Sequence, residues 1–402
     1  MPDTAVAAEL YSPEFAPEWA RFELYGLAQW INGLAFKDSD FSRVGVPVIK
    51  IVEIKNGLSS QTKRTAAKYD PKYFLVNGDM LFCWSGQPET SIDTCRWIGG
   101  EGWLNQHIFR VLPDEAVVEK DFFFYLLRYL RPTFVRIARN KQTTGLGHVT
   151  KKDLQNLTVA LPPLQYQRAV ATALGILDAR IESNRRIAEM IPRLIRALVC
   201  QSLQTGAREV AAADLANFVN GGAYTKGASG TGRMVIRISE LNSGPGSSTV
   251  YNDIAVPDDR MARQGDILMS WSGSLGIYRW CLDEAIVNQH IFKVVPGAEY
   301  PAWLVFDRLD EVMPIFRGIA KDKATTMGHI QRGHLQSTKV QVPFTEAIAR
   351  LHHRIAPAWE RLLVAERETV KLAALRDALL PELLSGRRRV SYATPGNVRF
   401  AL

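Results

Sequence analysis

The sequence contains little cysteine and no long apolar run, and each of these features excludes a class of protein. Only four cysteines occur among 402 residues, and no two of them form a Cys-x-x-Cys pair. Scattered cysteines of this kind predict neither a disulfide framework nor a structural zinc cluster. The four, which we expect to be reduced thiols, are Cys83, Cys95, Cys200 and Cys281.

No segment approaches the roughly 20 consecutive apolar residues that a membrane-spanning helix requires. The first 30 residues contain Asp3, Glu9, Glu14 and Glu18, where a secretory signal would carry basic residues followed by an apolar run. We therefore expect a cytoplasmic protein. Lys and Arg outnumber Asp and Glu by 49 to 41, and the resulting net charge of +8 permits a polyanionic partner without requiring one.

What the sequence does contain is an internal repeat, in which five blocks occur twice in the same order. The shift between the two copies changes only from 188 to 181 residues along the chain, so the copies share one scaffold and differ by small insertions and deletions. The paired blocks are 30–36 with 218–224, 49–57 with 236–244, 78–86 with 265–273, 105–111 with 288–294, and 143–149 with 325–330.

Each copy predicts a mixed α and β domain of about 140 residues. The apolar runs 46–54 and 80–84 are bounded by Gly, Asn and Asp, which is typical of strands. Residues 121–138 are rich in Phe, Leu, Tyr and Arg at helical spacing and predict a helix.

A long helical pattern follows each copy. The first has apolar residues at alternating steps of four and three, the seam of a coiled coil, with one polar member, Asn184, that would fix the register. A buried helix of a bundle is the ordinary explanation of one such stripe, but two equally long stripes after equivalent domains favour packing on each other. The first seam is Val170, Leu174, Leu177, Ile181, Asn184, Ala188, Ile191, Ile195 and Leu198, and the second stripe is Leu351, Ile355, Trp359, Leu362, Leu372, Leu375, Leu379 and Leu383.

These features resemble the specificity subunit of Type I restriction-modification systems. The resemblance covers nearly the whole chain and rests on Asn-Gln-His-Ile-Phe at 105–109 and 288–292, on Gly-Asp-Met-Leu at 78–81 and Gly-Asp-Ile-Leu at 265–268, and on the run from Gly147 to Gln167. That run has the family's order of Gly-His-Val, Asp-Leu and Leu-Pro-Pro-Leu-x-x-Gln before the first helix. The second copy departs from it, with Gln-Val-Pro-Phe-Thr-Glu at 341–346.

The resemblance implies an α+β chain with a pseudo-twofold repeat, in which two long antiparallel coiled-coil helices separate two homologous target recognition domains. It also implies a subunit that reads a bipartite site on double-stranded DNA. Two methyltransferase subunits would then methylate adenine, and motor-nuclease subunits, where the system includes them, would cut unmodified DNA. The expected segments are a tail at 1–20, the first domain at 21–162, the first spacer helix at 163–206, the second domain at 207–343, the second spacer helix at 344–390 and a tail at 391–402.

Candidate DNA contacts lie in loops of both copies. Two cations and two threonines precede each Gly-His block and could hold phosphates, although a solvated helix end would have the same composition. A further basic cluster is a candidate base-reading loop, because its expected counterpart, 243–248, is uncharged, although a neutral surface loop would also diverge. The phosphate candidates are Arg139, Lys141, Thr143, Thr144, Lys321, Lys323, Thr325 and Thr326, and the base-reading candidates are Lys63, Arg64 and Lys68.

Other residues recur identically in both copies, and this identity favours a structural role, since residues that read different half-sites should differ. We therefore expect the Gln-His pairs to form structural hydrogen bonds, the tryptophans to pack and the histidines of the Gly-His blocks to anchor a loop to a strand. These residues are Gln106, His107, Gln289, His290, Trp84, Trp271, His148 and His329.

We predict no catalytic residue, metal site or cofactor. The sequence has no G-x-x-x-x-G-K-[ST] phosphate loop, no Asn/Asp-Pro-Pro-aromatic motif for adenine methylation and no glycine-rich cofactor loop of the expected kind. Glu53-Ile54-Lys55 imitates the acidic-x-Lys arm of metal-dependent nucleases, but the second copy has Glu240-Leu241-Asn242. Such a nuclease and a coiled-coil interaction scaffold that reads no DNA remain the alternatives.

Overall fold

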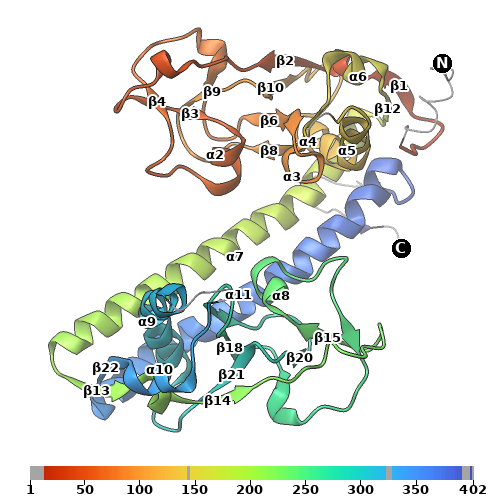
Figure 1. Cartoon of the computed structure of the whole chain (residues 1–402). Coiled ribbons are helices and arrows are strands. Elements are labelled where there is room, and N and C mark those ends of the chain that lie inside the picture. The colour runs from red at the N-terminus through yellow and green to blue at the C-terminus, as the bar shows by residue number, and fades with distance from the viewer. Residues whose placement is uncertain (1–12, 143–144, 323–327, 392–398, 401–402) are drawn as a thin grey trace. The chain divides into compact units, whose positions relative to one another are not determined.

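The computed structural model describes residues 13–142, 145–322, 328–391 and 399–400. The chain forms two compact units (Figure 1). Unit 1 comprises Met1–Asp178 and Leu375–Leu402, and unit 2 comprises Ala179–Ala374. Each unit therefore holds one copy of the repeat and part of each long helix. Within the described residues, no helix has a stretch long and apolar enough to cross a membrane.

Unit 1 contains two four-stranded sheets. The first, of order β2-β10-β6-β8, is antiparallel. The second, of order β4-β3-β9-β5, is mixed, because β3 and β9 are parallel whereas the outer pairs are antiparallel. The strands are β2 (Ala28–Asn32), β3 (Val46–Ile49), β4 (Arg64–Thr65), β5 (Phe74–Leu75), β6 (Met80–Cys83), β8 (Asp93–Arg96), β9 (Gly102–Leu104) and β10 (Ile108–Pro113).

Unit 2 repeats this arrangement. Its sheets have the orders β14-β21-β18-β19 and β16-β15-β20-β17, and the central pair of the second sheet is again parallel. The register agrees between units, since Val48 lies opposite Trp103 and Val235 lies opposite Ile286. The strands are β14 (Ala216–Asn220), β15 (Arg233–Ile236), β16 (Tyr251–Asn252), β17 (Met261–Ala262), β18 (Ile267–Ser270), β19 (Gly276–Arg279), β20 (Ala285–Val287) and β21 (Ile291–Pro296).

Two secondary-structure predictions need correction. The predicted strand 46–54 ends at Ile49, and α2 (Ile51–Asn56) follows, because the buried Glu53 carboxylate accepts a hydrogen bond from the Lys50 backbone N–H at 3.0 Å and caps the helix. The predicted helix 121–138 is divided into α4 (Lys120–Tyr129) and α5 (Arg131–Asn140), with Pro132 in the first turn of α5. In unit 2 the corresponding helix, α9 (Ala302–Asp322), continues through Pro314.

The core of unit 1 forms around α4, whose residues 122–127 are all buried. A helix that is apolar on every side needs cover on every side. In α4 the cover comes from the first sheet, from α5 and from the ends of the long helices that belong to unit 1. Short strand pairs join each copy to its long helix: β1 (Ala20–Glu23) pairs with β12 (Thr158–Leu161), and β13 (Ala207–Ala211) pairs with β22 (Lys339–Pro343).

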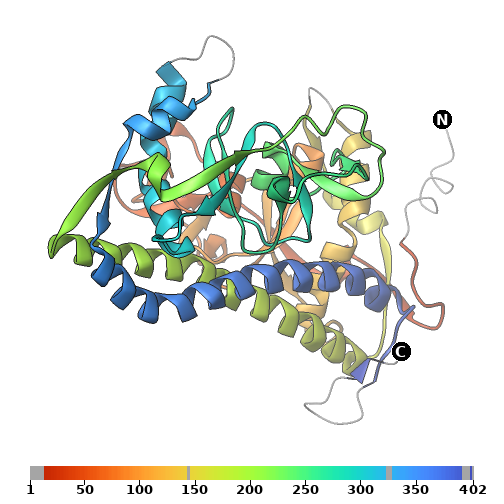
Figure 2. The same cartoon turned by 90° about the horizontal axis from the view of Figure 1, so that it is seen from below.

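The two long helices are α7 (Leu164–Gln204) and α11 (Thr345–Ser385), each of 41 residues. In unit 1 the start of α7 contacts the end of α11, where Arg376 pairs with Asp178 at 2.8 Å. In unit 2 the end of α7 packs with the start of α11, where Ile195 and Ile348 share one core. The helices are therefore antiparallel, as predicted, and Figure 2 shows them side by side. Leu375, which was placed on the apolar side, is instead 47% exposed.

The polar seam residue Asn184 is fully buried within unit 2. Its side-chain amide donates a hydrogen bond to Glu368 at 2.9 Å and accepts one from Arg361 at 3.1 Å. Arg180 holds the same Glu368 carboxylate through two hydrogen bonds, at 2.9 and 3.0 Å. Any other register of the two helices would be less stable, because sliding them would leave the buried Asn184 amide without its hydrogen-bond partners.

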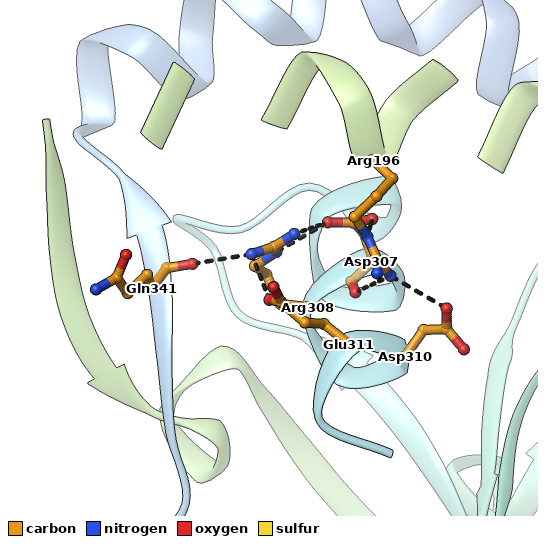
Figure 3. Close-up of polar contacts among 6 residues, drawn as sticks. All are labelled: Arg196, Asp307, Arg308, Asp310, Glu311 and Gln341. Atoms are coloured by element: carbon orange, nitrogen blue, oxygen red, sulfur yellow. Dashed lines mark hydrogen bonds and ion pairs between the residues drawn. The ribbon is translucent and has the colours of Figure 1, made fainter. Parts of the chain in front are cut away.

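A second buried polar network joins α7, α9 and β22 (Figure 3). Arg308 has no exposed surface and contacts Asp307, Glu311 at 2.5 Å and the backbone carbonyl of Gln341 at 3.4 Å. Arg196 of α7 reaches Asp307 from the other side. The network ties the helix that covers the sheet of unit 2 to the long helix beside it.

Candidate nucleic-acid interface

The predicted phosphate contacts of the first copy are engaged with carboxylates. Arg139, in the last turn of α5, forms an ion pair with Glu89. Lys141 donates to both oxygens of Asp153, at 2.5 and 2.7 Å. Burial alone would raise the pKa of Asp153, but the hydrogen bonds from Lys141 and Thr150 outweigh it and lower that pKa. Each cation would have to share or leave its carboxylate to reach a phosphate.

The predicted contacts of the second copy are less restrained. Lys321 lies in the last turn of α9 and is exposed, and it forms no ion pair with any described carboxylate. Arg139 and Lys321 thus occupy equivalent helix ends in the two copies, but Arg139 is paired with a carboxylate and Lys321 is not paired with any described carboxylate. The other candidates, Lys323, Thr325 and Thr326 in this copy and Thr143 and Thr144 in the first, lie outside the described residues.

The Gly-His blocks that follow are anchored to a tryptophan loop. In unit 1, β11 (Gly147–His148) pairs with β7 (Ser85–Gly86), and the Val149 N–H donates to the Trp84 carbonyl at 2.8 Å. In unit 2, His329 forms a bridge with Ser272, and Ile330 donates to Trp271 at 2.9 Å. The histidines of both blocks therefore lie in short backbone pairings with the tryptophan loop, and α6 (Lys151–Asn156) and α10 (Arg332–Ser337) separate them from the strands that lead into the long helices.

The two tryptophans have matching surroundings. The indole N–H of Trp84 donates to Asn32 at 2.9 Å, and that of Trp271 donates to Asn220 at 3.1 Å. Each ring also packs against the histidine of the Asn-Gln-His block, with centroid distances of 5.2 Å to His107 in unit 1 and 5.4 Å in unit 2. The tryptophans pack, as predicted. The hydrogen bonding expected of the Gln106 side chain stays a prediction.

Close backbone contact explains why the blocks around these residues recur. A Cβ atom at Gly33 would lie 2.1 Å from the Asn105 carbonyl oxygen, and one at Gly221 would lie 2.2 Å from that of Asn288. Only glycine permits this approach. The first and fourth repeated blocks are therefore two sides of one tight contact.

The predicted base-reading loop lies at the edge of the second sheet of unit 1. Lys63 immediately precedes β4, and the guanidinium of Arg64, the first residue of β4, donates to the Gly45 carbonyl at 2.8 Å. The Lys63 ammonium lies 5.8 Å from the ring centre of Phe41. Lys68 is exposed and lines a pocket next to this edge. The structure thus brings the three predicted cations to one edge of the sheet.

The counterpart of this loop differs from the one that the sequence suggested. The Val48 N–H donates to the Lys63 carbonyl at 2.8 Å, and the Val235 N–H donates to the Val250 carbonyl at 2.8 Å. The equivalent segment in unit 2 is therefore 250–255 and not 243–248. It contains no basic residue, so the difference in charge between the copies remains.

The glutamate of the nuclease-like triplet has a structural role. The Glu53 carboxylate caps α2, and Glu240 caps α8 (Ile238–Ser243) through the Arg237 backbone N–H at 3.0 Å. Burial would raise the pKa of Glu240, but hydrogen bonds from Arg237 lower it. Within the part of the chain that the structure describes, no three metal-ligating side chains form a cluster.

Sequence reasoning missed an aromatic cluster beside the basic loop. Its rings come from segments up to 67 residues apart, so that no local pattern reveals it. The signal that could have found it is the contrast between copies at Tyr69, Phe74 and Trp103, which correspond to Val256, Met261 and Ile286 in the second copy, although Phe36 corresponds to the aromatic Tyr224. The cluster is Phe36, Phe41, Tyr69, Phe74 and Trp103.

Comparison with known proteins agrees with this architecture. Residues 17–193 match the family model of the Type I restriction modification DNA specificity domain. Over this part, the chain is similar to the Type I restriction-modification specificity family. Over 181 residues it is 27% identical to the EcoBI specificity subunit of Escherichia coli, an alignment that covers 44% of this chain and 36% of the relative. The chain thus spans about a third of that relative's length.

Two further comparisons extend over more of the chain. The MjaIX specificity subunit of Methanocaldococcus jannaschii is 20% identical over 326 residues, covering 71% of this chain and 73% of the relative. The crystal structure of the Type I restriction-modification S subunit from M. genitalium superposes with a TM-score of 0.59 at 15% identity, over 92% of this chain and 98% of that one. At this identity the likeness concerns the fold.

Proposed function

We propose that this chain is the non-catalytic DNA-recognition subunit of a Type I restriction-modification complex in the cytoplasm. Each unit would read one half of a bipartite, asymmetric site on double-stranded DNA. Two methyltransferase subunits would supply adenine methylation, and motor-nuclease subunits would supply ATP-driven cleavage. The chain itself would need no cofactor.

The observation that carries this proposal is that one scaffold occurs twice with different surfaces. The tight glycine contact, the tryptophan loop and the mixed sheet are the same in both units. The edge of that sheet carries Lys63, Arg64 and Lys68 in unit 1, whereas 250–255 in unit 2 has no basic residue. A homodimer would present identical surfaces to two half-sites. A tandem chain can present two different ones, as an asymmetric site requires.

The test is sequence-selective binding by the full chain together with the methyltransferase subunits that copurify with it. Gel shifts against fragments of the source genome should select a subset of fragments, and methylation-sensitive sequencing of strains with and without this gene should lose one bipartite methylated motif. An interaction scaffold that reads no DNA would show the same affinity for every fragment and leave the methylome unchanged.

A further inference from the structure

The aromatic cluster of unit 1 forms the wall of a pocket with a cationic rim. The pocket has a volume of about 640 Å3, and Tyr69, Phe74 and Trp103 line it together with Lys68. This size lies within the usual range of small-ligand sites, about 300–1,000 Å3. The ring centres of Tyr69 and Trp103 are 5.3 Å apart, and those of Phe74 and Trp103 are 4.9 Å apart.

Lysine side chains lie around part of the aromatic cluster. Lys50 and Lys63 lie 5.1 and 5.8 Å from the ring centre of Phe41, which stacks on Phe36 next to Tyr69. With Lys68 they make three lysines around the cluster, and none of the three forms an ion pair with a described carboxylate. A cationic ligand would be repelled here, whereas an aromatic ligand with an attached anion fits both the rings and the rim.

The fold does not require aromatic residues at these positions. The register places Ile286 where unit 1 has Trp103 and Met261 where it has Phe74, and the preceding turns place Val256 where it has Tyr69. In unit 2 these aliphatic residues pack together around the buried Val235. Lys63 and Lys68 are replaced by Val250 and Ala255, whereas Lys50 corresponds to Arg237, which is paired with Glu240. Aliphatic side chains at these three positions thus suffice for the scaffold, and Tyr224, the counterpart of Phe36, packs beside them.

A buried donor in the pocket wall also lacks an acceptor. The Trp103 side chain is 6% exposed, and its indole N–H has no hydrogen-bond partner among the described residues. Buried polar groups are almost always satisfied, and an exception commonly marks a place where a ligand or water completes the site.

We propose that this pocket takes one nucleobase of the DNA half-site read by unit 1, turned out of the duplex stack, with adjoining phosphates on the lysine rim. The inference rests on the proposed function and adds the residues by which unit 1 holds its half-site. Aromatic side chains bind base faces, which are covered by neighbours inside a duplex, so the base must leave the stack to reach them. The unpaired lysines supply the phosphate attraction.

The test measures whether the effect of removing the Tyr69 ring on DNA binding depends on the presence of one base of the half-site. We replace Tyr69 by Val, the residue of unit 2, in the full chain with its copurifying methyltransferase subunits, and measure binding to the recognised duplex. We then repeat the measurement with each base of the half-site removed in turn to leave an abasic position. Tyr69→Val should weaken binding to the intact site by about 5- to 150-fold, the usual effect of losing one stacking ring. At one abasic position this loss should disappear.

The matched control is Tyr25→Val. Tyr25 is also a half-buried tyrosine of unit 1 with a lysine near its ring, Lys151 at 4.9 Å, but it lies outside the pocket. It should leave binding unchanged. A second variant, Lys68→Ala, alters an exposed side chain that no packing depends on, and it should reduce the salt dependence of log K by about 0.9 for one lost phosphate contact.

The possible outcomes distinguish failure of the pocket proposal from failure of the proposed function. If the wild-type complex selects its site and neither Tyr69→Val nor Lys68→Ala alters binding, the pocket proposal is wrong and the proposed function stands. If Tyr69→Val weakens binding equally at every abasic position, the ring has no base partner and the proposal is again wrong. If the wild type shows no sequence preference, the proposed function fails and the pocket proposal fails with it. Free dAMP at millimolar concentration should not compete with the duplex, whereas competition would show a mononucleotide site instead.

Discussion

At the scale of single residues, the surroundings of a cation decide how it can act on DNA. Arg139 and Lys141 are held by Glu89 and Asp153, whereas Lys321 is exposed at the end of α9. An ion pair at the surface contributes only about 0–1 kcal/mol, so a phosphate can compete for such a cation. The predicted phosphate contacts are therefore supported by the equivalent positions of Arg139 and Lys321 at helix ends, and not by the absence of ion pairs.

Replacing Lys321 by Ala should weaken binding to all DNA sequences alike, because a phosphate contact carries no sequence information. The steepness of the decrease of log K with log salt should be reduced by about 0.9, the value for one lost phosphate contact.

The double variant Arg139→Ala with Lys141→Ala should reduce the steepness of this salt dependence by about one to two phosphate equivalents. Arg186→Ala, which removes an exposed α7 arginine paired with Glu182, serves as the control. A slope that stays at the wild-type value would remove these residues from the interface.

The buried Arg308 offers a stability prediction at the same scale. Arg308→Met should lower the free energy of unfolding by about 3–5 kcal/mol, because it leaves the buried Asp307 carboxylate without one of its partners. Urea unfolding followed by tryptophan fluorescence measures the change. Arg186→Met alters an exposed pair and should cost less than about 1 kcal/mol. Equal effects of the two substitutions would show that the network contributes no more than a surface pair.

At the scale of elements, the two long helices connect the units at defined positions. α7 passes from unit 1 into unit 2 after Asp178, and α11 passes back after Ala374. The contacts of Asp178 with Arg376 and of Asn184 with Glu368 lie on either side of this crossing, each within one unit. Extra residues at the crossing therefore leave the contacts of both units intact.

We predict that the paired helices act as a ruler. Inserting four residues after Asp178 and four after Ala374 adds about one helical turn, or about 6 Å, to both helices. The gap between the recognised half-sites should grow by about one to two base pairs at roughly 3.4 Å each, with both half-sites unchanged. Methylome sequencing of a strain carrying the variant measures the gap.

The control for the ruler is an insertion in α7 alone, which shifts one helix against the other. That variant should lose the Asn184 register and assemble poorly. If the doubly lengthened protein methylates sites at the original spacing, the helices do not set the gap and serve only as a docking surface for the modification subunits.

At the scale of the whole molecule, the units are separate in their cores. The buried clusters of unit 1 and unit 2 share no residue, although each includes part of both long helices. Strand pairs β1–β12 and β13–β22 join the two ends of each copy. Each copy is therefore a candidate for exchange as a module.

Exchanging residues 20–161 for the equivalent domain of a relative should change one half of the recognised sequence. The other half and the gap should stay the same, because both strands of the β1–β12 pair move together and the core of unit 2 is untouched. Methylome sequencing reports both halves at once, with the unexchanged chain as reference. Changes in both halves would show that the two units read DNA jointly.

The amino-acid sequence by itself determined the repeat, the two long helices and the resemblance to Type I specificity subunits, because these depend on local periodicity and on similarity that can be read along the chain. It also located the tryptophan and Gly-His blocks, whose identity in two copies marked them as scaffold. It failed for the strand expected over 46–54, because the capping contact that turns residues 51–56 into a helix uses a buried glutamate that apolar patterning ignores.

Only the tertiary structure decided which loops are equivalent, which cations are paired and where the aromatic pocket lies. Equivalent backbone hydrogen bonds show that Lys63 and Val250 occupy the same position in the two units. Lys141 forms an ion pair with Asp153, which lies 12 residues further along the chain. Tyr69 and Trp103 are in contact across 34 positions because β9, which contains Trp103, pairs with β5, which follows the turn after Tyr69. Such contacts depend on strand order and register, which arise from packing of the whole unit and leave no periodic trace in the sequence.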